Sequence, residues 1–434
     1  MVKVESLRAE RKFKKTEIGE IPVDWKVLRV KDVCEKPEYG YTASAVEKPL
    51  GPKFLRITDI QDGKVIWNNV PYCNCPDNLK ERYIIRSGDI LFARTGATTG
   101  KSYLIKDCPE AVFASYLIRV AVNEQIDSHF LYSVFNSSIY WRQITQQMGG
   151  SAQGGVNASS LANIKIPLPP LSEQKKIAEI LSTVDEAIEK NNLVIEKTRE
   201  LKKGLMQELL TRGIGHKRFK KAEIGEIPAD WEVVSTGDIL KDLPGAIKIG
   251  PFGSQLKKEY FVKDGFKVYG QENVFYSNFT IGNRRITKDR FQMLQSCQLH
   301  GGDIVVSMMG TVGKCAIIPE GIEPGIMDSH LLRLQIDAKK FSKNFLRHLI
   351  SDSALVKRQI KQLSVGGIME GLSSNIVKKL RFPCPPLSEQ KKIAEILSTV
   401  DKIVENEITH EKGLEKIRKA LMQVLLTGKV RVKN

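Results

Sequence analysis

Hydrophobic residues recur at helical spacing in a long segment that starts near the middle of the chain. Apolar side chains and one asparagine alternate at intervals of four and three residues: Ile177, Leu181, Val184, Ile188, Asn191 and Ile195. The stripe then shifts slightly and continues through Leu201, Leu205 and Leu209 to Gly213. Ser172, behind two prolines, is the expected N-cap. About 39 residues without proline predict a helix roughly 58 Å long at ~1.5 Å per residue.

A second stripe of the same kind lies near the C-terminus. It begins at Ser388, ends at Gly428 and contains Ile393, Leu397, Val400, Val404, Leu414, Leu421 and Leu425. A narrow apolar stripe with charges on the other faces is typical of a coiled-coil seam. We therefore predict a helix–helix interface that contains Ile177, Leu181, Val184, Ile188, Asn191, Ile195, Ile393, Leu397, Val400 and Val404. Asn191 in such a seam either fixes register or orientation, or is a tolerated polar position.

The segments before the two helices have a different pattern. Short apolar runs bounded by Gly, Ser and Asp predict strands at 83–85, 90–93 and 116–120. Residues 127–147 and 342–363 have helical spacing. Each of these segments is therefore expected to form a mixed α/β globular domain of about 120–140 residues.

The chain also contains an internal repeat. Residues 13–25 (FKKTEIGEIPVDW) recur almost unchanged as residues 219–231 (FKKAEIGEIPADW), and residues 169–185 (PPLSEQKKIAEILSTVD) recur identically as residues 385–401. We call these repeated stretches the frames. A period near 210 residues is too long for a solenoid, so the repeat indicates tandem duplication of a whole module.

The material between the frames shares only a skeleton in the two copies. Gly88-Asp89-Ile90 corresponds to Gly302-Asp303-Ile304, and Ser115, Leu117 and Arg119 correspond to Ser329, Leu331 and Arg333. We call residues 37–160 and 240–376 the first and second inserts. Recent duplication alone would explain why the frames are nearly identical, but it does not explain why the inserts diverged. The divergence indicates that the frames are held to one common geometry while the two inserts have different tasks. The expected order is a globular domain at 1–170, a helix at 171–213, a second globular domain at 214–386 and a second helix at 387–434.

Charge is spread unevenly over this repeat. The 67 Lys and Arg residues exceed the 50 Asp and Glu residues, which gives a net charge of +17 and weakly favours a polyanionic partner. The first insert has 12 basic and 11 acidic residues, whereas the second has 19 and 12. Seven scattered cysteines do not resemble a disulfide framework, so a reducing cytoplasm fits best. No apolar stretch is long enough to predict a transmembrane helix, and residues 1–15 lack the features of a secretory signal.

Basic side chains near glycine-flanked loops suit contact with DNA phosphates, whereas Arg, Gln and Asn also suit base edges. Each candidate taken singly is also compatible with an ordinary surface or loop role. The candidates in the first insert are Lys53, Arg56, Arg82, Arg86, Arg94, Lys101, Gln153 and Asn157. Those in the second insert are Lys248, Lys257, Gln271, Asn273, Arg284, Arg285, Lys288, Arg290 and Lys314.

The sequence matches known motifs of catalysis and metal binding poorly. GATTGK, from Gly96 to Lys101, has one residue too few between its glycines for a phosphate-binding loop, and a tight turn between strands with Lys101 and Lys314 at loop tips is expected instead. Cys73 and Cys75 lack a second ligand pair for zinc. The Asn/Asp-Pro-Pro-aromatic tetrapeptide of adenine methyltransferases does not occur, which disfavours a stand-alone methyltransferase.

Three motifs together resemble the specificity subunit of type I restriction–modification systems. They are GEIPxDW near the start of each half, GDIxxxxxGxxxGK inside the first insert with GDIxxxxxGxxGK at the same place in the second, and PLPPLSEQKKIAEIL at the first long helix with its counterpart at the second. The resemblance covers nearly the whole chain. It implies two target recognition domains that each read one half of a split DNA sequence, separated by two antiparallel helices that act as a spacer.

The resemblance also implies partners. Two methyltransferase subunits would carry S-adenosylmethionine and methylate adenine, and restriction/translocase subunits would cleave unmodified DNA. The specificity subunit itself would be cytoplasmic, bind no cofactor or metal, and have no catalytic residue. The alternative left open by the residues is a coiled-coil adaptor that bridges protein partners without reading DNA.

Overall fold

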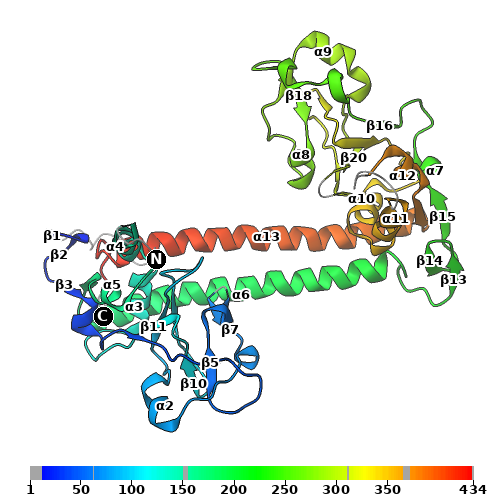
Figure 1. The fold of residues 1–434 in the computed structure, drawn as a ribbon. Coiled ribbons are helices and arrows are strands. Elements are labelled where there is room, and N and C mark those ends of the chain that lie inside the picture. Colours follow the sequence, from blue (N-terminus) through cyan, green and yellow to red (C-terminus); the bar gives the residue numbers. More distant parts are fainter. Residues whose placement is uncertain (1–11, 62, 150–154, 310–311, 365–371, 433–434) are drawn as a thin grey trace. The chain divides into compact units, whose positions relative to one another are not determined.

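The computed structural model describes residues 12–61, 63–149, 155–309, 312–364 and 372–432. The chain packs as two compact units: unit 1 comprises residues 1–192 and 409–434, and unit 2 comprises residues 193–408. Both long helices, α6 (Leu171–Leu209) and α13 (Leu387–Leu425), contribute to both units (Figure 1). The four-part division predicted above follows the order of the sequence, whereas packing joins each globular part to segments of both helices.

Unit 1 is built on short strands and helices around a four-stranded antiparallel sheet with the order β4-β11-β8-β9. Its strands are β1 (Phe13–Thr16), β2 (Gly19–Pro22), β3 (Lys26–Arg29), β4 (Glu38–Tyr39), β5 (Lys53–Leu55), β6 (Ile60–Gln61), β7 (Lys64–Val65), β8 (Ile90–Ala93), β9 (Ser102–Leu104), β10 (Ala111–Phe113), β11 (Leu117–Val120) and β12 (Lys165–Leu168). Its shorter helices are α1 (Val30–Val33), α2 (Asp77–Tyr83), α3 (Ser128–Phe135), α4 (Ser138–Gly149) and α5 (Ala158–Ala162), with 3-10 turns at Ile57–Asp59 and Trp67–Asn69.

Unit 2 repeats this plan and enlarges it. Its strands are β13 (Phe219–Ala222), β14 (Gly225–Pro228), β15 (Glu232–Ser235), β16 (Ile247–Ile249), β17 (Phe261–Val262), β18 (Phe266–Tyr269), β19 (Arg285–Ile286), β20 (Ile304–Ser307), β21 (Cys315–Ile317), β22 (Gly325–Met327), β23 (Leu331–Leu334) and β24 (Arg381–Cys384). Its shorter helices are α7 (Thr236–Ile239), α8 (Gln271–Phe275), α9 (Lys288–Met293), α10 (Lys343–Asp352), α11 (Ala354–Ser364) and α12 (Ser374–Lys379), with 3-10 turns at Gly253–Gln255, Lys258–Tyr260 and Gln295–Cys297.

The shared skeleton of the inserts is visible in the sheets. The order β16-β23-β20-β21 in unit 2 matches β4-β11-β8-β9 in unit 1, and the parallel pair β18–β22 matches β5–β10. In unit 2 this parallel pair is extended by β19 and β17 into a second four-stranded sheet. The prediction of mixed α/β domains on a duplicated frame is therefore confirmed.

The long helices agree with the sequence prediction in length but differ at their first residue. Each has 39 residues, and each begins one residue before the expected serine cap, at Leu171 and Leu387. Glu173 and Gln174 donate their backbone N–H groups to the carbonyl of Pro170. Ser172 therefore lies in the first turn, because the preceding proline can supply the opening carbonyl of the helix.

The strand and short-helix predictions were partly wrong. Strands at 90–93 and 116–120 are present as β8 and β11, but Tyr83 is the last residue of α2 and Ile84 forms only an isolated bridge to Val112. The helix expected at 127–147 is two helices, α3 and α4, because Ser137 bonds to the carbonyl of Val134 through its hydroxyl and starts a second helix. In unit 2, Ser353 stands between α10 and α11, and its hydroxyl accepts from the backbone N–H of Leu355 as that of Ser137 accepts from Ile139.

Most residues of the predicted helix interface are buried. Ile177, Leu181, Asn191, Ile195, Ile393, Leu397 and Val400 are buried, whereas Val184, Ile188 and Val404 are half-buried. Ile177 and Leu181 join one core with Trp25, Phe130 and Leu425. The beginning of each stripe therefore packs into its own domain core as well as against the other helix. Leu201, which the stripe included, is 57% exposed because the apolar face has rotated away from the seam by that point.

Polar contacts fix the direction of the helix pair inside each unit. In unit 1, Asp185 bonds to Arg418, and the amide oxygen of Asn191 lies 2.9 Å from Nδ1 of His410. Residue numbers rise along α6 while those of the partners on α13 fall, so the two segments are antiparallel. In unit 2, Lys202 forms the corresponding ion pair with Asp401. Asn191 therefore has a specific partner on the other helix, which supports a role in register.

A carboxylate ties the frames together in each unit; Glu173 is buried and Glu389 is half-buried. In unit 1, Glu173 accepts hydrogen bonds from the indole of Trp25 (3.2 Å) and from Nε of Arg431 (2.7 Å). Arg431 also donates to Asp24 (2.8 Å) and holds the pKa of that carboxyl below its ordinary value. In unit 2, Glu389 accepts from Trp231 (3.1 Å) and lies 2.8 Å from the ring of His216, which takes the position of Arg431. We call these two groups the carboxylate clasps.

Substituting Glu173→Ala tests the clasp of unit 1. The change leaves the Trp25 N–H and part of the Arg431 guanidinium without a partner in a buried site, so we expect the free energy of unfolding to fall by about 2–4 kcal/mol. Urea denaturation followed by far-UV circular dichroism measures the change. Glu179→Ala is the matched control, since Glu179 is exposed on the same helix and pairs only with Lys176. Equal losses in the two variants would show that the clasp does not stabilise the unit.

Candidate nucleic-acid interface

The loop between β8 and β9 brings two candidate cations to the surface of unit 1. Arg94 and Lys101 flank it, and Ala93 exchanges backbone hydrogen bonds with Lys101 and Gly100 (3.0 and 2.8 Å). Both cations are exposed, and neither forms an ion pair with a carboxylate in the part of the chain that the structure describes. The prediction of a tight turn between strands is confirmed, but Lys101 lies at the base of the hairpin rather than at its tip.

The ring of Tyr39 and backbone hydrogen bonds hold Arg94 in place. Its guanidinium lies over the ring of Tyr39 at 4.9 Å, and the Tyr39 hydroxyl accepts a hydrogen bond from the backbone N–H of Ala158 (3.1 Å). The backbone N–H of Arg94 donates to Tyr116, and its carbonyl accepts from Val156, both at 3.1 Å. Tyr116 is 60% exposed. We call Arg94, Lys101, Tyr39, Tyr116 and Asn157 the first loop surface.

Asn157 has a structural task at this surface. It is the N-cap of α5, where its side-chain oxygen accepts from the backbone N–H of Ser160 (2.8 Å). The residue is nevertheless exposed at the surface of the domain. Gln153, the other polar candidate of this insert, lies outside the described residues.

The other cations predicted in the first insert bind partners inside the domain. Lys53 donates to the carbonyl of Val70 (2.7 Å), and Arg56 forms an ion pair with Asp59 (2.8 Å) that raises the pKa of Arg56. Arg82 and Arg86 are exposed but lie 3.6 Å from Glu38 and 3.3 Å from Glu81. Their charges are therefore largely balanced locally, unlike those of Arg94 and Lys101.

Unit 2 has the same loop scaffold with different side chains. Met308 occupies the position of Arg94: its backbone N–H donates to His330 (2.9 Å) and its carbonyl accepts from Leu372 (2.8 Å). The Met308 side chain is only 7% exposed and packs into the core of unit 2. Lys314, the counterpart of Lys101, is exposed at the start of β21. The two inserts therefore share a positively charged hairpin base but differ at the Arg94 position.

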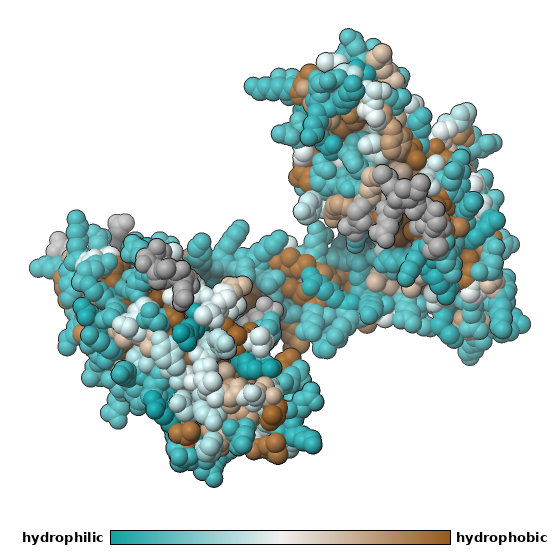
Figure 2. Space-filling view, viewed as in Figure 1, coloured by the Kyte–Doolittle hydropathy of each residue, from teal (hydrophilic) through white to brown (hydrophobic). Residues whose placement is uncertain are grey.

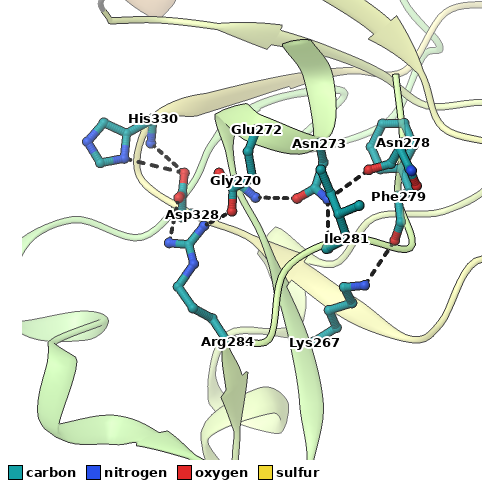
Figure 3. Close-up of polar contacts among 10 residues, drawn as sticks. All are labelled: Lys267, Gly270, Glu272, Asn273, Asn278, Phe279, Ile281, Arg284, Asp328 and His330. Carbon is teal, nitrogen blue, oxygen red and sulfur yellow. Dashed lines mark hydrogen bonds and ion pairs between the residues drawn. The ribbon is translucent and has the colours of Figure 1, made fainter. Parts of the chain in front are cut away.

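A buried polar network occupies the neighbouring part of unit 2 (Figure 3). Arg284 bonds to Asp328 (2.9 Å) and Glu272 (3.0 Å), and although burial opposes its charge, these carboxylates hold the pKa of Arg284 above its ordinary value. Asn273 is fully buried: its side-chain oxygen accepts from Gly270, and its amide nitrogen donates to the carbonyls of Asn278 and Ile281. We therefore correct two expectations: Asn273 is not available to a DNA base, and Arg284 is a structural cation that anchors α8.

The remaining candidates of the second insert lie in several places. Gln271 donates through its amide nitrogen to the carbonyl of Met309 (2.7 Å), which leaves its oxygen as an acceptor. Lys288 is exposed at the start of α9, and Arg290 lies over the ring of Tyr260 at 3.7 Å. Arg285 is paired with Glu323, and Lys257 lies 3.5 Å from Glu259. Lys248 is half-buried in β16 and lines a cavity of about 370 Å³ together with Lys378.

Exposed aromatic residues at these surfaces were missed by the sequence analysis. Besides Tyr39 and Tyr116, they include Phe275 and Tyr276 at the end of α8, and Tyr276 is 74% exposed. Tyr116 sits in an apolar run that predicts a buried strand. A turn formed by Ala114 and Leu117, whose backbone groups bond to each other at 2.8 Å, carries it outward.

The sites considered for metal binding are apolar. Cys73 and Cys75 are buried beside Phe54 and Val112, and burial raises the pKa of the Cys73 thiol to about 11. Within the described ranges, no group of three or more His, Cys, Asp or Glu residues is arranged to hold a metal ion. In the same ranges, no helix is long and apolar enough to cross a membrane.

Comparison with known proteins agrees with this architecture. The family model described as the type I restriction modification DNA specificity domain matches residues 22–197 and again residues 228–417. The putative type I restriction enzyme MjaX specificity subunit of Methanocaldococcus jannaschii is 33% identical over 98% of both chains. The MjaVIII specificity subunit of the same organism is 30% identical over 100% of this chain and 99% of the relative.

Solved structures show the same fold. A type I restriction–modification specificity subunit from M. genitalium is 15% identical, with a TM-score of 0.56 over 92% of this chain and 96% of that chain. A chain from a structural study of assembly and conformational transition of a type I system is 17% identical, with a TM-score of 0.53 over 94% and 99%. These matches confirm the resemblance recognised in the sequence: the chain belongs to the family of type I restriction–modification DNA specificity subunits.

Proposed function

We propose that each insert binds double-stranded DNA and reads one half of a two-part target. The observation that carries this proposal is the repeated hairpin with an exposed lysine at its base, Lys101 in unit 1 and Lys314 in unit 2, on which the two inserts present different neighbouring side chains. Lysines on such a base suit sequence-independent phosphate contacts, and the side chains that differ suit base contacts. Two dissimilar readers on one frame imply an asymmetric target.

The chain is proposed to contribute no catalytic residue of its own. A Ser–His–Asp arrangement does occur in unit 2, where His348 lies 3.3 Å from both Ser398 and Asp352. However, His348 is fully buried between α10 and α13, and burial lowers its pKa. A substrate carbonyl has no access to such a site, so we interpret it as helix packing. S-adenosylmethionine is accordingly expected on a partner methyltransferase subunit, and restriction/translocase subunits would act on unmodified DNA in the cytoplasm.

The long helices are proposed to set the spacing between half-targets and to dock two methyltransferase subunits. Leu201 on α6 and Ile417 on α13 occupy equivalent positions of the repeat and are 57% and 51% exposed. On the face seen in Figure 2, hydrophobic surface interrupts the hydrophilic surface of the long helices. Exposed apolar side chains at equivalent positions fit two copies of one partner, because each copy would meet the same local surface.

Exchanging the first insert tests the modular reading. Replacing residues 37–160 with the insert of another specificity subunit should change one half of the methylated sequence, because the second insert and both helices are untouched. Methylome sequencing of the host reports both half-targets and the gap between them. The second half and the gap should stay as in the wild type, and a change in both halves, or in neither, would contradict the proposal.

Salt dependence separates this function from a coiled-coil adaptor that bridges proteins. The chain assembled with its methyltransferase partner should lose at least about tenfold in DNA affinity between ~50 and ~200 mM salt, because phosphate contacts release condensed counterions. Fluorescence anisotropy with a labelled duplex that contains the methylated sequence measures this slope. An adaptor that reads no DNA would show no preference for that duplex over a scrambled one at any salt concentration.

Introducing negative charge at the two exposed apolar positions tests the docking surface. Leu201→Glu together with Ile417→Glu should weaken methyltransferase binding by about tenfold or more, since the apolar contact is lost and a charge is buried. Each single variant should retain one partner per chain. Sedimentation analysis of the co-expressed complex gives the stoichiometry, and Lys190→Glu, at an exposed position of α6, is the control for added negative charge. Two bound partners in the double variant would place the docking surface elsewhere.

A further inference from the structure

We propose that Arg94 is a specificity-determining residue, which reads a guanine in the half-target of the first insert through its guanidinium group. This inference rests on the proposed DNA-binding function and deepens it by assigning one base contact. It concerns a single side chain at the end of β8, where the first loop surface begins.

The first step is the availability of the Arg94 charge. Arg56, Arg82 and Arg86 each lie within 3.6 Å of a carboxylate, whereas Arg94 is exposed and has no carboxylate partner among the described residues. Arg119, on β11 of the central sheet, is buried and pairs with Glu38. Arg94 therefore combines exposure with an uncompensated charge, which a ligand with acceptor atoms can satisfy.

The second step is orientation. Stacking on Tyr39 restricts the plane of the guanidinium, and the Tyr39 hydroxyl is itself fixed by the backbone of Ala158. The backbone of Arg94 is held on both sides, by Tyr116 and by Val156. A guanidinium group held in this way loses little conformational freedom when it binds a base. Its planar set of N–H donors matches the O6 and N7 acceptors of guanine in the major groove.

The third step is the contrast within the hairpin. Lys101, at the other end of the loop, is a compact charge that no aromatic ring orients among the described contacts, which suits a phosphate rather than a base. The two ends of one loop thus have different tasks, one for position and one for sequence.

The equivalent position of unit 2 shows that the contact is specific to one half-target. The backbone of Met308 bonds to His330 and Leu372, the counterparts of the residues that bond to Arg94, but its side chain is buried in the core. The second insert instead places α8 beside β20, with Gln271 bound to the carbonyl of Met309. A guanine contact from this position is therefore expected for the first insert alone.

The test compares four variants of the full chain, each co-expressed with the host methyltransferase subunit. Competition binding uses duplexes in which every base pair of the methylated sequence is varied in turn. Arg94→Ala and Arg94→Lys should lose about 5- to 100-fold discrimination at one G·C pair of one half-target. Tyr39→Leu should lose part of the same discrimination, because the ring that orients the fork is gone. Lys101→Ala should weaken all duplexes equally and reduce the salt slope by about 1.

Three outcomes would overturn the inference. Uniform weakening by Arg94→Ala without a change in base preference would identify a phosphate contact, and unchanged binding would show that Arg94 does not touch DNA. Lost discrimination at a pair other than G·C would also contradict it. The wild-type complex separates these failures from failure of the proposed function, since absence of sequence preference in the wild type would refute DNA reading itself. Arg94 is exposed, so circular dichroism should show folding unchanged in all its variants.

Discussion

The fold depends on a hydrogen bond between a glutamate carboxylate, buried in unit 1 and half-buried in unit 2, and a tryptophan indole. Glu173 and Glu389 are the third residues of the two long helices, and Trp25 and Trp231 end the GEIPxDW motifs. A carboxylate in such a site is costly unless every donor around it is placed correctly. This constraint gives a physical reason for the near identity of the frames, because each pair of frames must bring the same indole donor to the same acceptor.

The clasps also involve the chain just beyond the opposite helix. Gly213 and Gly428 lie in the left-handed region, and an added Cβ at these positions would lie 2.5 Å from Trp231 and 2.4 Å from Pro22. Three residues later, His216 or Arg431 reaches the clasp carboxylate.

The inserts are not required to keep the same donors and acceptors in the two units. Arg119 pairs with Glu38 across the sheet, whereas its counterpart Arg333 lies opposite Lys248, binds backbone carbonyls and has its pKa lowered by burial.

The long helices and the central strands were predictable because their burial follows a regular period. Ile177 and Leu181 belong to a stripe in which apolar residues recur every three or four positions, and β8 is a run of four buried apolar side chains. The surface was less predictable, because Arg56 and Arg94 look equivalent in sequence and differ only in their neighbours. Asp59, three residues from Arg56, binds it in a 3-10 turn, whereas Arg94 meets Tyr39 from a distant strand. Asn273 illustrates the same limit, since its amide nitrogen donates to carbonyls of the loop that follows α8.

The composition of unit 1 has a consequence for its synthesis. Its core contains Trp25 and Val30, from the start of the chain, together with Met422, Leu425 and Leu426, from its end. The part of unit 1 that precedes unit 2 in the chain therefore cannot complete its core until α13 has been made, while unit 2, whose residues are contiguous, can close earlier. Until α13 has been made, part of the apolar surface of the nascent unit 1 stays uncovered, and chaperones bind such surface. Because this core is built from segments on both sides of unit 2, the first recognition domain completes its folding after the second.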